Sequence, residues 1–224
     1  MLKGLIFDLD GVITDSAKYH WIAWNALAQK LDIQLPSKAK DALKGLSRMD
    51  SLNLILKYGN QQDRYSETEK QKFAAEKNAM YLESIKKMTP DDLLPGISKL
   101  LSDARKQNLK MAIASASLNA PRILQQLQII NEFDAIVDPA TLHKGKPDPE
   151  IYVKAQELLR LKANEVISFE DAASGVAAIK AAHQFAVGIG NKKVLKAADY
   201  IVPTTADLSL DKIEAIFLKK VGSR

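Results

Sequence analysis

Two aspartates near the start of the chain have the type and spacing of a site for phosphoryl chemistry. Asp8 and Asp10 follow the apolar run 2–7, which the sequence predicts to be a buried parallel strand that ends at Asp8. At strand spacing both side chains point to one side, beyond the carboxyl end of a sheet, where open α/β folds bind ligands. Two carboxylates so close need a divalent cation or a proton to offset their charge. A metal-bound carboxylate beside one that carries protons is suited to nucleophilic attack on a phosphoryl group.

Further groups of polar residues follow apolar runs later in the chain. The Ser-Ala-Ser stretch at 115–117 offers a hydroxyl and backbone N–H groups at a strand-to-helix turn, where phosphate oxygens bind. Lys146 lies in a proline-containing turn, and lysine binds phosphate as a point charge. Glu170 and Asp171 end another apolar run, and adjacent acids there are most simply explained by a bound metal ion.

Each group taken alone also fits a plainer explanation. Asp8 and Asp10 fit a strand that ends in a turn, and 115–117 fits the N-cap of a helix. Lys146 fits an exposed loop lysine. Their order along the chain (acid pair, hydroxyl, lysine, second acid pair) favours a single site that handles phosphate.

Alternation of strands and helices in 89–224 predicts the unit that positions these groups. The pattern places strands at 110–115, 135–138, 166–170, 185–189 and 200–202, and helices at 120–127, 149–159 and 175–182. This βαβ rhythm indicates an α/β fold: a Rossmann-like parallel sheet with helices on both faces. The first strand joins the same sheet, so we expect one core domain formed by 1–15 and 89–224.

The intervening residues 16–88 predict helices only. The pattern places them at 17–31, 37–43, 49–58 and 66–87, and Ser66 to Glu69 has the form of a capping box. Antiparallel helices with short connections form a small bundle, so we expect a four-helix cap inserted into the core. The chain passes between the two units near 14–16 and near 88–95, and two such passages make a hinge.

The predicted cap has its own candidates for ligand binding. Ser16, His20 and Trp24 recur every four residues and share one helix face, which we expect to look into the cleft. Arg48 lies beside a glycine-containing turn, and Lys77 lies on the last cap helix. The plainer explanations are a core histidine, a core tryptophan and solvated cations.

Composition narrows the classes of protein. The chain has 224 residues, is 46% hydrophobic and has no cysteine, which allows a large core and excludes disulfides and thiolate metal sites. Oxygen ligands suit Mg²⁺ better than zinc. The net charge of +5 fits anionic substrates, but no basic stripe interleaved with aromatics indicates nucleic-acid binding. No apolar stretch predicts a membrane span and no signal peptide precedes the first strand, so we expect a cytoplasmic protein, and a monomer because the cap must move.

The acid pair, hydroxyl, lysine and second acid pair resemble the haloacid dehalogenase-like superfamily of phosphotransferases over nearly the whole chain. The resemblance implies that Asp8 is the nucleophile and becomes an aspartyl phosphate. It implies that Asp10 is the general acid/base and also binds Mg²⁺ through its main-chain carbonyl. The resemblance also implies a site for one Mg²⁺ per chain. Its implied ligands are Asp8, Asp10, Glu170 and Asp171. The residues that match the phosphate ligands are Ser115 and Lys146.

Several segments resemble the β-phosphoglucomutase family within this superfamily, namely 7–15, 19–20, 43–48, 114–117 and 146–149. The resemblance implies that Arg48, Ser117 and Asn119 hold the phosphate that is not being transferred. It implies that His20 and Lys77 position the sugar and Asp10. Further implied substrate-binding residues are Ala116, Trp24, Lys44, Gly45, Leu46 and Ser47, and Ser16 is the implied hinge residue. Leu118 departs from relatives that have lysine there, which bears on how strongly the second phosphate is held.

The implied reaction converts β-glucose 1-phosphate to glucose 6-phosphate through phospho-Asp8 and β-glucose 1,6-bisphosphate. A sugar-phosphate or phosphoglycolate phosphatase of the same fold is the alternative, because Asp8 and Asp10 do not distinguish the two. A non-catalytic sugar-phosphate-binding protein is a third reading, against which the intact acid pair argues. We expect the Lys146–Pro147 bond to be trans, because only about 5–6% of such bonds are cis in folded proteins.

Overall fold

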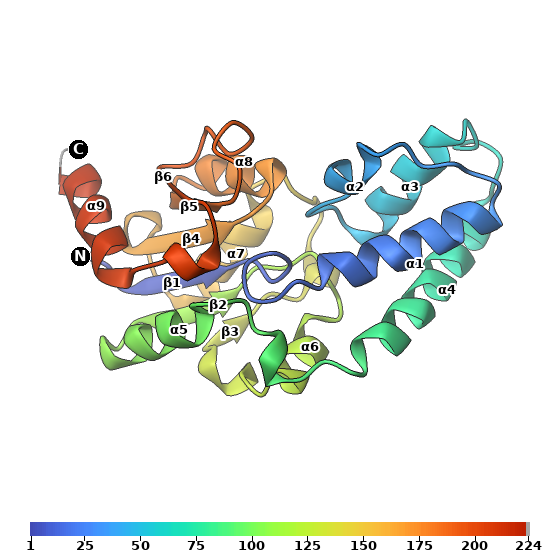
Figure 1. Cartoon of the computed structure of the whole chain (residues 1–224). Helices are drawn as coiled ribbons and strands as arrows, with labels where there is room; N and C mark the ends of the chain where they lie inside the picture. The colour runs from blue at the N-terminus through green and yellow to red at the C-terminus, as the bar shows by residue number, and fades with distance from the viewer. Residues whose placement is uncertain (223–224) are drawn as a thin grey trace. The chain divides into compact units, whose positions relative to one another are not determined.

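The chain folds into two compact units. The computed structural model describes residues 1–222. One unit combines Met1–Asp15 with the chain from Thr89 onward, and the other is Ser16–Met88. Figure 1 shows a sheet with helices in the first unit and helices in the second. Their roles as catalytic core and cap stay predictions at this point.

The first unit is built on a parallel six-stranded sheet with the order β3-β2-β1-β4-β5-β6. Its strands are β1 (Gly4–Phe7), β2 (Lys110–Ile113), β3 (Ala135–Ile136), β4 (Val166–Glu170), β5 (Phe185–Ile189) and β6 (Tyr200–Val202). Phe7 at the end of β1 lies opposite Ile113 of β2 and Phe169 of β4. The strand order reverses at β1, so the carboxyl ends of β1, β2 and β4 meet where parallel sheets bind ligands.

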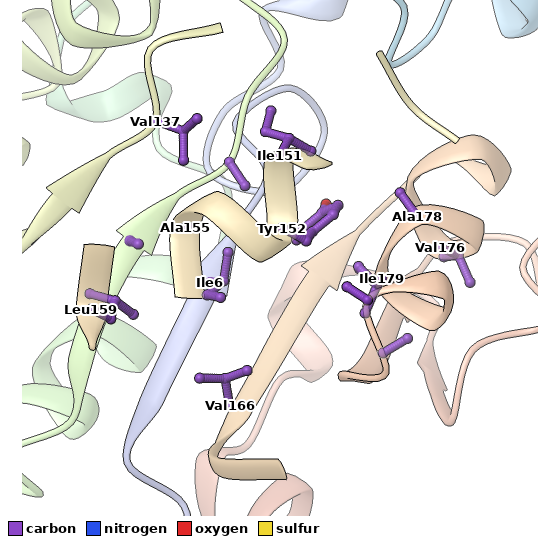
Figure 2. Packing of buried hydrophobic residues seen from close by; sticks show 14 of the residues in the cluster. Ile6, Val137, Ile151, Tyr152, Ala155, Leu159, Val166, Val176, Ala178 and Ile179 are labelled. Atoms are coloured by element: carbon purple, nitrogen blue, oxygen red, sulfur yellow. The ribbon is translucent and has the colours of Figure 1, made fainter. Parts of the chain in front are cut away.

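Helices cover both faces of this sheet, as the sequence predicts. They are α5 (Ile97–Lys106), α6 (Ala120–Gln126), α7 (Glu150–Leu159), α8 (Ala173–Ala181) and α9 (Leu210–Gly222). On one face α7 and α8 pack over a cluster that includes Ile6 and Val166, which Figure 2 shows from close by. On the other face Phe217 of α9 meets Phe185 of β5 edge to face, with ring centroids 5.5 Å apart. Short 3-10 turns lie at Pro90–Asp92, Ile130–Glu132, Pro139–Thr141, Ala163–Glu165 and Thr205–Asp207.

The second unit contains α1 (Ala17–Lys30), α2 (Ala39–Ala42), α3 (Arg48–Tyr58) and α4 (Glu67–Ile85). Pairwise packing of α1, α3 and α4 buries Leu27, Leu52 and Ile55 completely. The predicted capping box is confirmed, because the Ser66 hydroxyl accepts from the backbone N–H of Glu69, whose carboxylate accepts from the N–H of Ser66. The helix predicted at 37–43 is only one turn long, because nucleation is costly and so short a segment adds few bonds.

Several predicted elements need correction. The bounds predicted for β4, β5 and β6 are confirmed, whereas β1 ends at Phe7 rather than at Asp8. The backbone N–H of Asp8 still donates to the carbonyl of Phe169 at 3.1 Å, so pairing continues one residue past the strand. The strands β2 and β3 are shorter than predicted, and α5 and α9 were not predicted. Among residues 1–222, no helix has the length and apolar composition that crossing a bilayer requires.

Candidate active site

Asp8 lies directly beyond the carboxyl end of the central strand. Its side chain is buried, with 4% of the residue exposed. A tight turn follows, in which the N–H groups of Ile13 and Thr14 donate to the carbonyl of Leu9 at 2.9 and 3.2 Å. This turn holds Asp10 close enough that its charge raises the pKa of Asp8. The two aspartates therefore interact, as their spacing predicts.

Two glycines leave space for the acids at the end of β4. Gly11 has a φ of +79°, and a Cβ there would lie 2.3 Å from Asp171 Oδ2. A Cβ on Gly175 would lie 1.8 Å from Glu170 Oε1. Each approach is far inside van der Waals contact, so glycine at these positions is what lets Glu170 and Asp171 take their places.

The loop that presents Lys146 is organised by a carboxylate at the start of α7. Glu150 Oε2 accepts from the backbone N–H groups of His143 and Lys144 at 2.9 and 2.8 Å. The N–H of Glu150 in turn donates to Asp148 Oδ1 at 3.0 Å. The prediction of a trans bond between Lys146 and Pro147 is wrong, because the bond is cis. In an ordered loop the surrounding structure selects the isomer, and the general frequency does not apply.

Lys146 lies at the centre of the site. Its ammonium group donates to Asp8 Oδ1 at 2.8 Å and to Glu170 Oε1 at 2.5 Å. The Lys146 side chain is 1% exposed, so the interpretation as an exposed loop lysine is wrong. The Tyr152 hydroxyl also donates to Glu170 Oε1, at 3.1 Å. A buried lysine is stable only when paired, and here two carboxylates pair with it.

Burial and charge set opposing preferences in this cluster. Burial raises the pKa of Asp8 well above its ordinary value, and the ammonium of Lys146 opposes that shift. Burial lowers the pKa of Lys146, but the carboxylates of Asp8 and Glu170 outweigh it and hold the pKa above its ordinary value. Lys146 therefore stays cationic, and Asp8 needs further positive charge to stay fully ionised.

The acids suit a hard divalent cation. Asp8, Glu170 and Asp171 each offer a carboxylate oxygen, and these oxygens lie within 4.8 Å of one another. A set of carboxylate oxygens without nitrogen or sulfur is typical of Mg²⁺. The repulsion predicted between Glu170 and Asp171 is partly relieved by Lys146 and by the N–H of Ala172, which donates to Glu170 Oε2 at 2.9 Å. One lysine does not balance three carboxylates, so the residues fit the implied metal.

Ser115 lies two residues beyond β2, next to the end of β1. The N–H of Ala114 donates to the carbonyl of Phe7 at 2.8 Å, which extends the pairing of the two strands toward Ser115. The Ser115 hydroxyl accepts from the N–H of Ser117 at 3.1 Å, and the Ser117 hydroxyl accepts from the N–H of Asn119 at 3.3 Å. Ser115 is buried and does not cap α6, because the N-cap of that helix is Asn119.

Hydrogen bonds join the segment in which the chain leaves the first unit, near Thr14, to the segment in which it returns, near Leu94. The Thr14 hydroxyl donates to the carbonyl of Asp92 at 2.7 Å, and the N–H of Leu94 donates to the carbonyl of Ile13 at 3.0 Å. Ser16, the predicted hinge residue, is completely buried at the start of α1. These bonds fix where the chain leaves the sheet and where it returns.

The second unit contains a compact cluster of polar and aromatic side chains. Lys77 Nζ lies 2.7 Å from His20 Nδ1. The same ammonium lies 4.6 Å from the ring centroid of Trp24 and 4.8 Å from that of Tyr81. Trp24 is 3% exposed and belongs to the hydrophobic core of this unit. The helical spacing predicted that its indole lines an open face, and that prediction is wrong for Trp24.

The charge state of His20 follows from these neighbours. Burial, and then the positive charges of Lys77 and Arg48, lower the pKa of His20 well below its ordinary value. The imidazole is therefore neutral near pH 7. Since Lys77 is a donor only, Nδ1 of His20 accepts its hydrogen bond and the ring proton is on Nε2.

Arg48 lies at the start of α3, after the turn formed by Lys44, Gly45 and Leu46. Ser47 is the N-cap, and its hydroxyl accepts from the N–H of Asp50 at 3.1 Å. The Arg48 guanidinium donates to Asn78 Oδ1 at 2.8 Å and is half-buried. Burial lowers the pKa of Arg48, which still leaves it charged.

Within each unit the structure brings some of the predicted residues together. Asp8, Lys146, Glu170 and Asp171 form one cluster in the first unit, and Asp10 acts on Asp8 electrostatically. In the second unit the clustered residues are His20, Trp24 and Lys77, and the charge of Arg48 reaches His20.

Three residues of these clusters were missed from sequence. Tyr152 occupies an apolar position of α7, Glu150 is an ordinary first-turn acid, and Asn78 is an unremarkable helix residue. Glu150 carried a signal, since an acid in the first turn of a helix often caps nearby backbone. The contacts of Tyr152 and Asn78 are made between elements distant in sequence, so no local pattern could have shown them.

Comparison with known proteins identifies the family. The model of the haloacid dehalogenase-like hydrolase family matches residues 2–183. The chain belongs to this family. Its fold and the cluster of acids around Lys146 accord with that membership.

Relatives in the haloacid dehalogenase-like family include mutases and phosphatases. The chain is 47% identical to β-phosphoglucomutase of Bacillus subtilis over 210 residues. This match covers 94% of this chain and 93% of that protein. A crystal structure of β-phosphoglucomutase from Clostridium difficile matches with a TM-score of 0.97 and 41% identity, over 99% of this chain and 100% of that one. A phosphorylated-carbohydrate phosphatase of Thermotoga maritima is 27% identical over 81% of this chain and 82% of that protein.

Proposed function

We propose that this chain is a β-phosphoglucomutase, an isomerase that interconverts β-D-glucose 1-phosphate and glucose 6-phosphate. The observation that carries the assignment is the 47% identity to the Bacillus subtilis enzyme across nearly the whole length of both chains. The cluster of Asp8, Lys146 and the acids at the end of β4 supplies chemistry that fits this reaction.

The proposed reaction begins with a phosphoryl group on Asp8. The sugar hydroxyl attacks phosphorus, the bond between phosphorus and the Asp8 oxygen breaks, and Asp10 takes the hydroxyl proton. The product is a glucose bisphosphate, which then returns its other phosphoryl group to Asp8 while Asp10 gives the proton back. No phosphoryl group or proton is lost over the cycle, so the net reaction is an isomerisation.

Lys146 and Ser115 are the proposed ligands of the phosphoryl group that moves. Lys146 already donates to Asp8 Oδ1 at 2.8 Å, so its charge lies beside the carboxylate that is proposed to form and break the bond to phosphorus. A cation at such a position stabilises the negative charge that develops in the transition state. The Ser115 hydroxyl and the N–H groups of its turn are suited to the phosphoryl oxygens.

Asp8, Glu170 and Asp171, with the main-chain carbonyl of Asp10, are the proposed ligands of one Mg²⁺ per chain. When bound, Mg²⁺ supplies charge neutralisation for the transferring phosphoryl group and favours the ionised form of Asp8. The raised pKa of Asp8 gives a reason for that requirement, because a buried carboxylate with acidic neighbours needs more positive charge than Lys146 provides.

The cationic residues of the helical unit are proposed to bind the substrate. Arg48 is the proposed ligand of the phosphate that is not being transferred, because a guanidinium matches phosphate geometry and keeps its charge. His20 and Lys77 are proposed to orient the sugar and Asp10, and the turn of Lys44, Gly45, Leu46 and Ser47 to shape the same site. Asn119, Ser117 and Ala116 complete the proposed phosphate-binding turn of the first unit.

A primed mutase assay tests the assignment. The full chain is given β-glucose 1-phosphate, Mg²⁺ and a trace of glucose 1,6-bisphosphate, and glucose 6-phosphate is measured beside free inorganic phosphate. We expect glucose 6-phosphate to form, only with the β anomer and only after priming. Release of inorganic phosphate as the main product from either anomer would contradict the assignment.

A phosphatase of the same fold is the second candidate. The observation in its favour is the 27% identity to the Thermotoga maritima phosphatase. The phosphate measurement in the same assay distinguishes it from a mutase. We also propose that the chain is cytoplasmic and that it is a monomer, because the cap must move. Light scattering of the purified chain measures the oligomeric state.

A further inference from the structure

Tyr152 is buried beneath the candidate active site and is used by none of the steps above. It lies in the first turn of α7 and is completely buried. Figure 2 shows its ring between α7 and the neighbouring strand β4. Its phenol oxygen lies 3.1 Å from Glu170 Oε1, at the end of that strand. A tyrosine in a hydrophobic cluster thus carries one polar atom, and that atom is directed at a proposed metal ligand.

The backbone of Tyr152 is also bonded toward β4. The side-chain amide of Gln184 donates through Nε2 to the backbone carbonyl of Tyr152 at 2.9 Å. Its side-chain oxygen, Oε1, accepts from the Ser168 hydroxyl at 2.6 Å. Ser168 lies on β4, two residues before Glu170, and is completely buried, while Gln184 is almost so. Tyr152 is therefore anchored to the same strand at both its backbone and its hydroxyl, which fixes the direction of the phenol.

Among residues 1–222, three groups donate hydrogen bonds to Glu170, and only one of them has a second role in the proposed reaction. Lys146 and Tyr152 both donate to Oε1, at 2.5 and 3.1 Å, and the N–H of Ala172 donates to Oε2 at 2.9 Å. Lys146 must also engage the phosphoryl group during each transfer, so its bond to Glu170 is the one that competes with catalysis. The other two donors have no such second task.

We propose that Tyr152 is a positioning residue that holds Glu170 Oε1 in its metal-binding orientation while Lys146 turns its ammonium toward the phosphoryl group. The phenol is neutral and held by the helix, so it compensates the carboxylate without adding a charge that would repel Mg²⁺. The Lys146 ammonium lies 5.2 Å from the centroid of the Tyr152 ring, so the aromatic face supports the lysine beside the same acid.

Removal of only the hydroxyl tests this role without any measurement of turnover. Metal-free Tyr152→Phe is titrated with Mg²⁺ by calorimetry, beside the unaltered chain and Tyr65→Phe. Tyr65 is the matched control, because its hydroxyl donates to a side-chain oxygen, Gln61 Oε1, at 2.9 Å in the other unit. We expect Tyr152→Phe to bind Mg²⁺ about 10-fold more weakly, as is typical when the partner of a metal ligand is removed. Tyr65→Phe is expected to bind as the unaltered chain does.

A double-mutant cycle with Lys146→Met tests the division of labour. With Lys146 absent, Tyr152 is the remaining side-chain donor to Glu170 Oε1. We therefore expect Tyr152→Phe to weaken Mg²⁺ binding more in the Lys146→Met background than in the unaltered chain. The Lys146→Met chain and the double variant both lack the Lys146 ammonium, so the loss of its repulsion of Mg²⁺ cancels when their affinities are compared.

The outcomes are decisive even when a variant is less stable. The rise in Tm that saturating Mg²⁺ produces reports the same affinity in a destabilised chain. Mg²⁺ affinity of Tyr152→Phe equal to that of the unaltered chain, or additive effects in the cycle, would overturn the proposal. The proposal depends on the proposed function in one respect, namely that a phosphoryl group in the site draws the Lys146 ammonium away from Glu170. Because the titrations need no turnover, their failure is distinct from failure of the mutase assay.

Discussion

The two units place charge in opposite ways. In the first unit Asp8 and Glu170 pair with the ammonium of Lys146, and an Asp171 oxygen lies within 4.8 Å of theirs, so that cluster carries excess negative charge. In the second unit Lys77 and Arg48 lie near a neutral His20, so that cluster carries excess positive charge. One cluster is suited to a divalent cation and the other to an anion, and a magnesium-dependent enzyme with a phosphorylated substrate needs both.

The partners in the two clusters differ as well. Lys146 is held by carboxylates in a buried ion pair, at the ends of neighbouring strands. Lys77 contacts an imidazole nitrogen and two aromatic rings, and Arg48 contacts an amide oxygen. The comparison shows that the strand ends of the first unit hold the proposed reacting groups, while the helical unit holds the cations that are proposed to bind phosphate.

The largest effect is expected at the centre of the acidic cluster. Lys146→Met should lower mutase turnover by about 10²–10³-fold, as loss of one fixed electrostatic stabiliser typically does. It should also lower the free energy of unfolding by about 3–5 kcal/mol, because two buried carboxylates lose their cation. Steady-state assay and urea unfolding measure the two effects.

Lys180→Met is the matched control for that variant. Lys180 pairs with Asp199 at 2.7 Å, and the Asp199 side chain is 3% exposed, but this pair joins the last turn of α8 to the residue before β6 and not to the end of β4. We expect a loss of stability with turnover unchanged within about twofold. Equal losses of turnover in both variants would remove the distinction between a structural and a functional ion pair.

An intermediate effect is expected in the cationic cluster. Arg48→Ala should weaken bisphosphate binding by about 10–100-fold, the range for loss of a hydrogen bond to a charged group. Phosphorylation of Asp8 by acetyl phosphate should be largely preserved, since that reaction needs no second phosphate. Arg64→Ala is the control, because Arg64 is an exposed arginine of the same unit that lies over the Tyr65 ring. Equal loss of labelling and of mutase turnover in Arg48→Ala would contradict the contrast between the clusters.

The smallest effect concerns the pH dependence of stability. Burial and the charge of Lys77 lower the pKa of folded His20, so the unfolded chain binds the proton more tightly. Stability from a neutral His20 is therefore present above the unfolded pKa of about 6.5 and is lost as the pH falls below it. His20→Gln should lose less stability than the unaltered chain between neutral pH and about pH 5. Equal losses by urea unfolding would show that His20 does not carry the effect.

The sequence was most informative where neighbours along the chain share one environment. Strands β4 and β5 are buried on both faces, so their apolar runs predicted their bounds directly. The capping box at Ser66 was equally local. Helix α5 was not predicted, although Ile97, Leu100 and Leu101 are apolar residues at helical spacing and are buried in the structure.

The candidate site was predictable in its residue types and not in its connections. Asp8, Lys146 and the acids at the end of β4 were identified because each lies at the end of an apolar strand or in a turn marked by proline and glycine. That Lys146 bridges Asp8 and Glu170 depends on strand order and loop conformation, which local sequence does not encode. Tyr152 was out of reach for the same reason, because a tyrosine at an apolar helix position gives no indication of what its hydroxyl meets.

The central claim is that Asp8 accepts a phosphoryl group with Mg²⁺ bound beside it. The most direct measurement is mass spectrometry of the full chain after brief exposure to acetyl phosphate and Mg²⁺, followed by mapping of the modified residue. The account predicts one added phosphoryl group, on the peptide that contains Asp8, absent without Mg²⁺ and absent in Asp8→Asn. Labelling that persists in Asp8→Asn, or mutase turnover that survives this substitution, would contradict it.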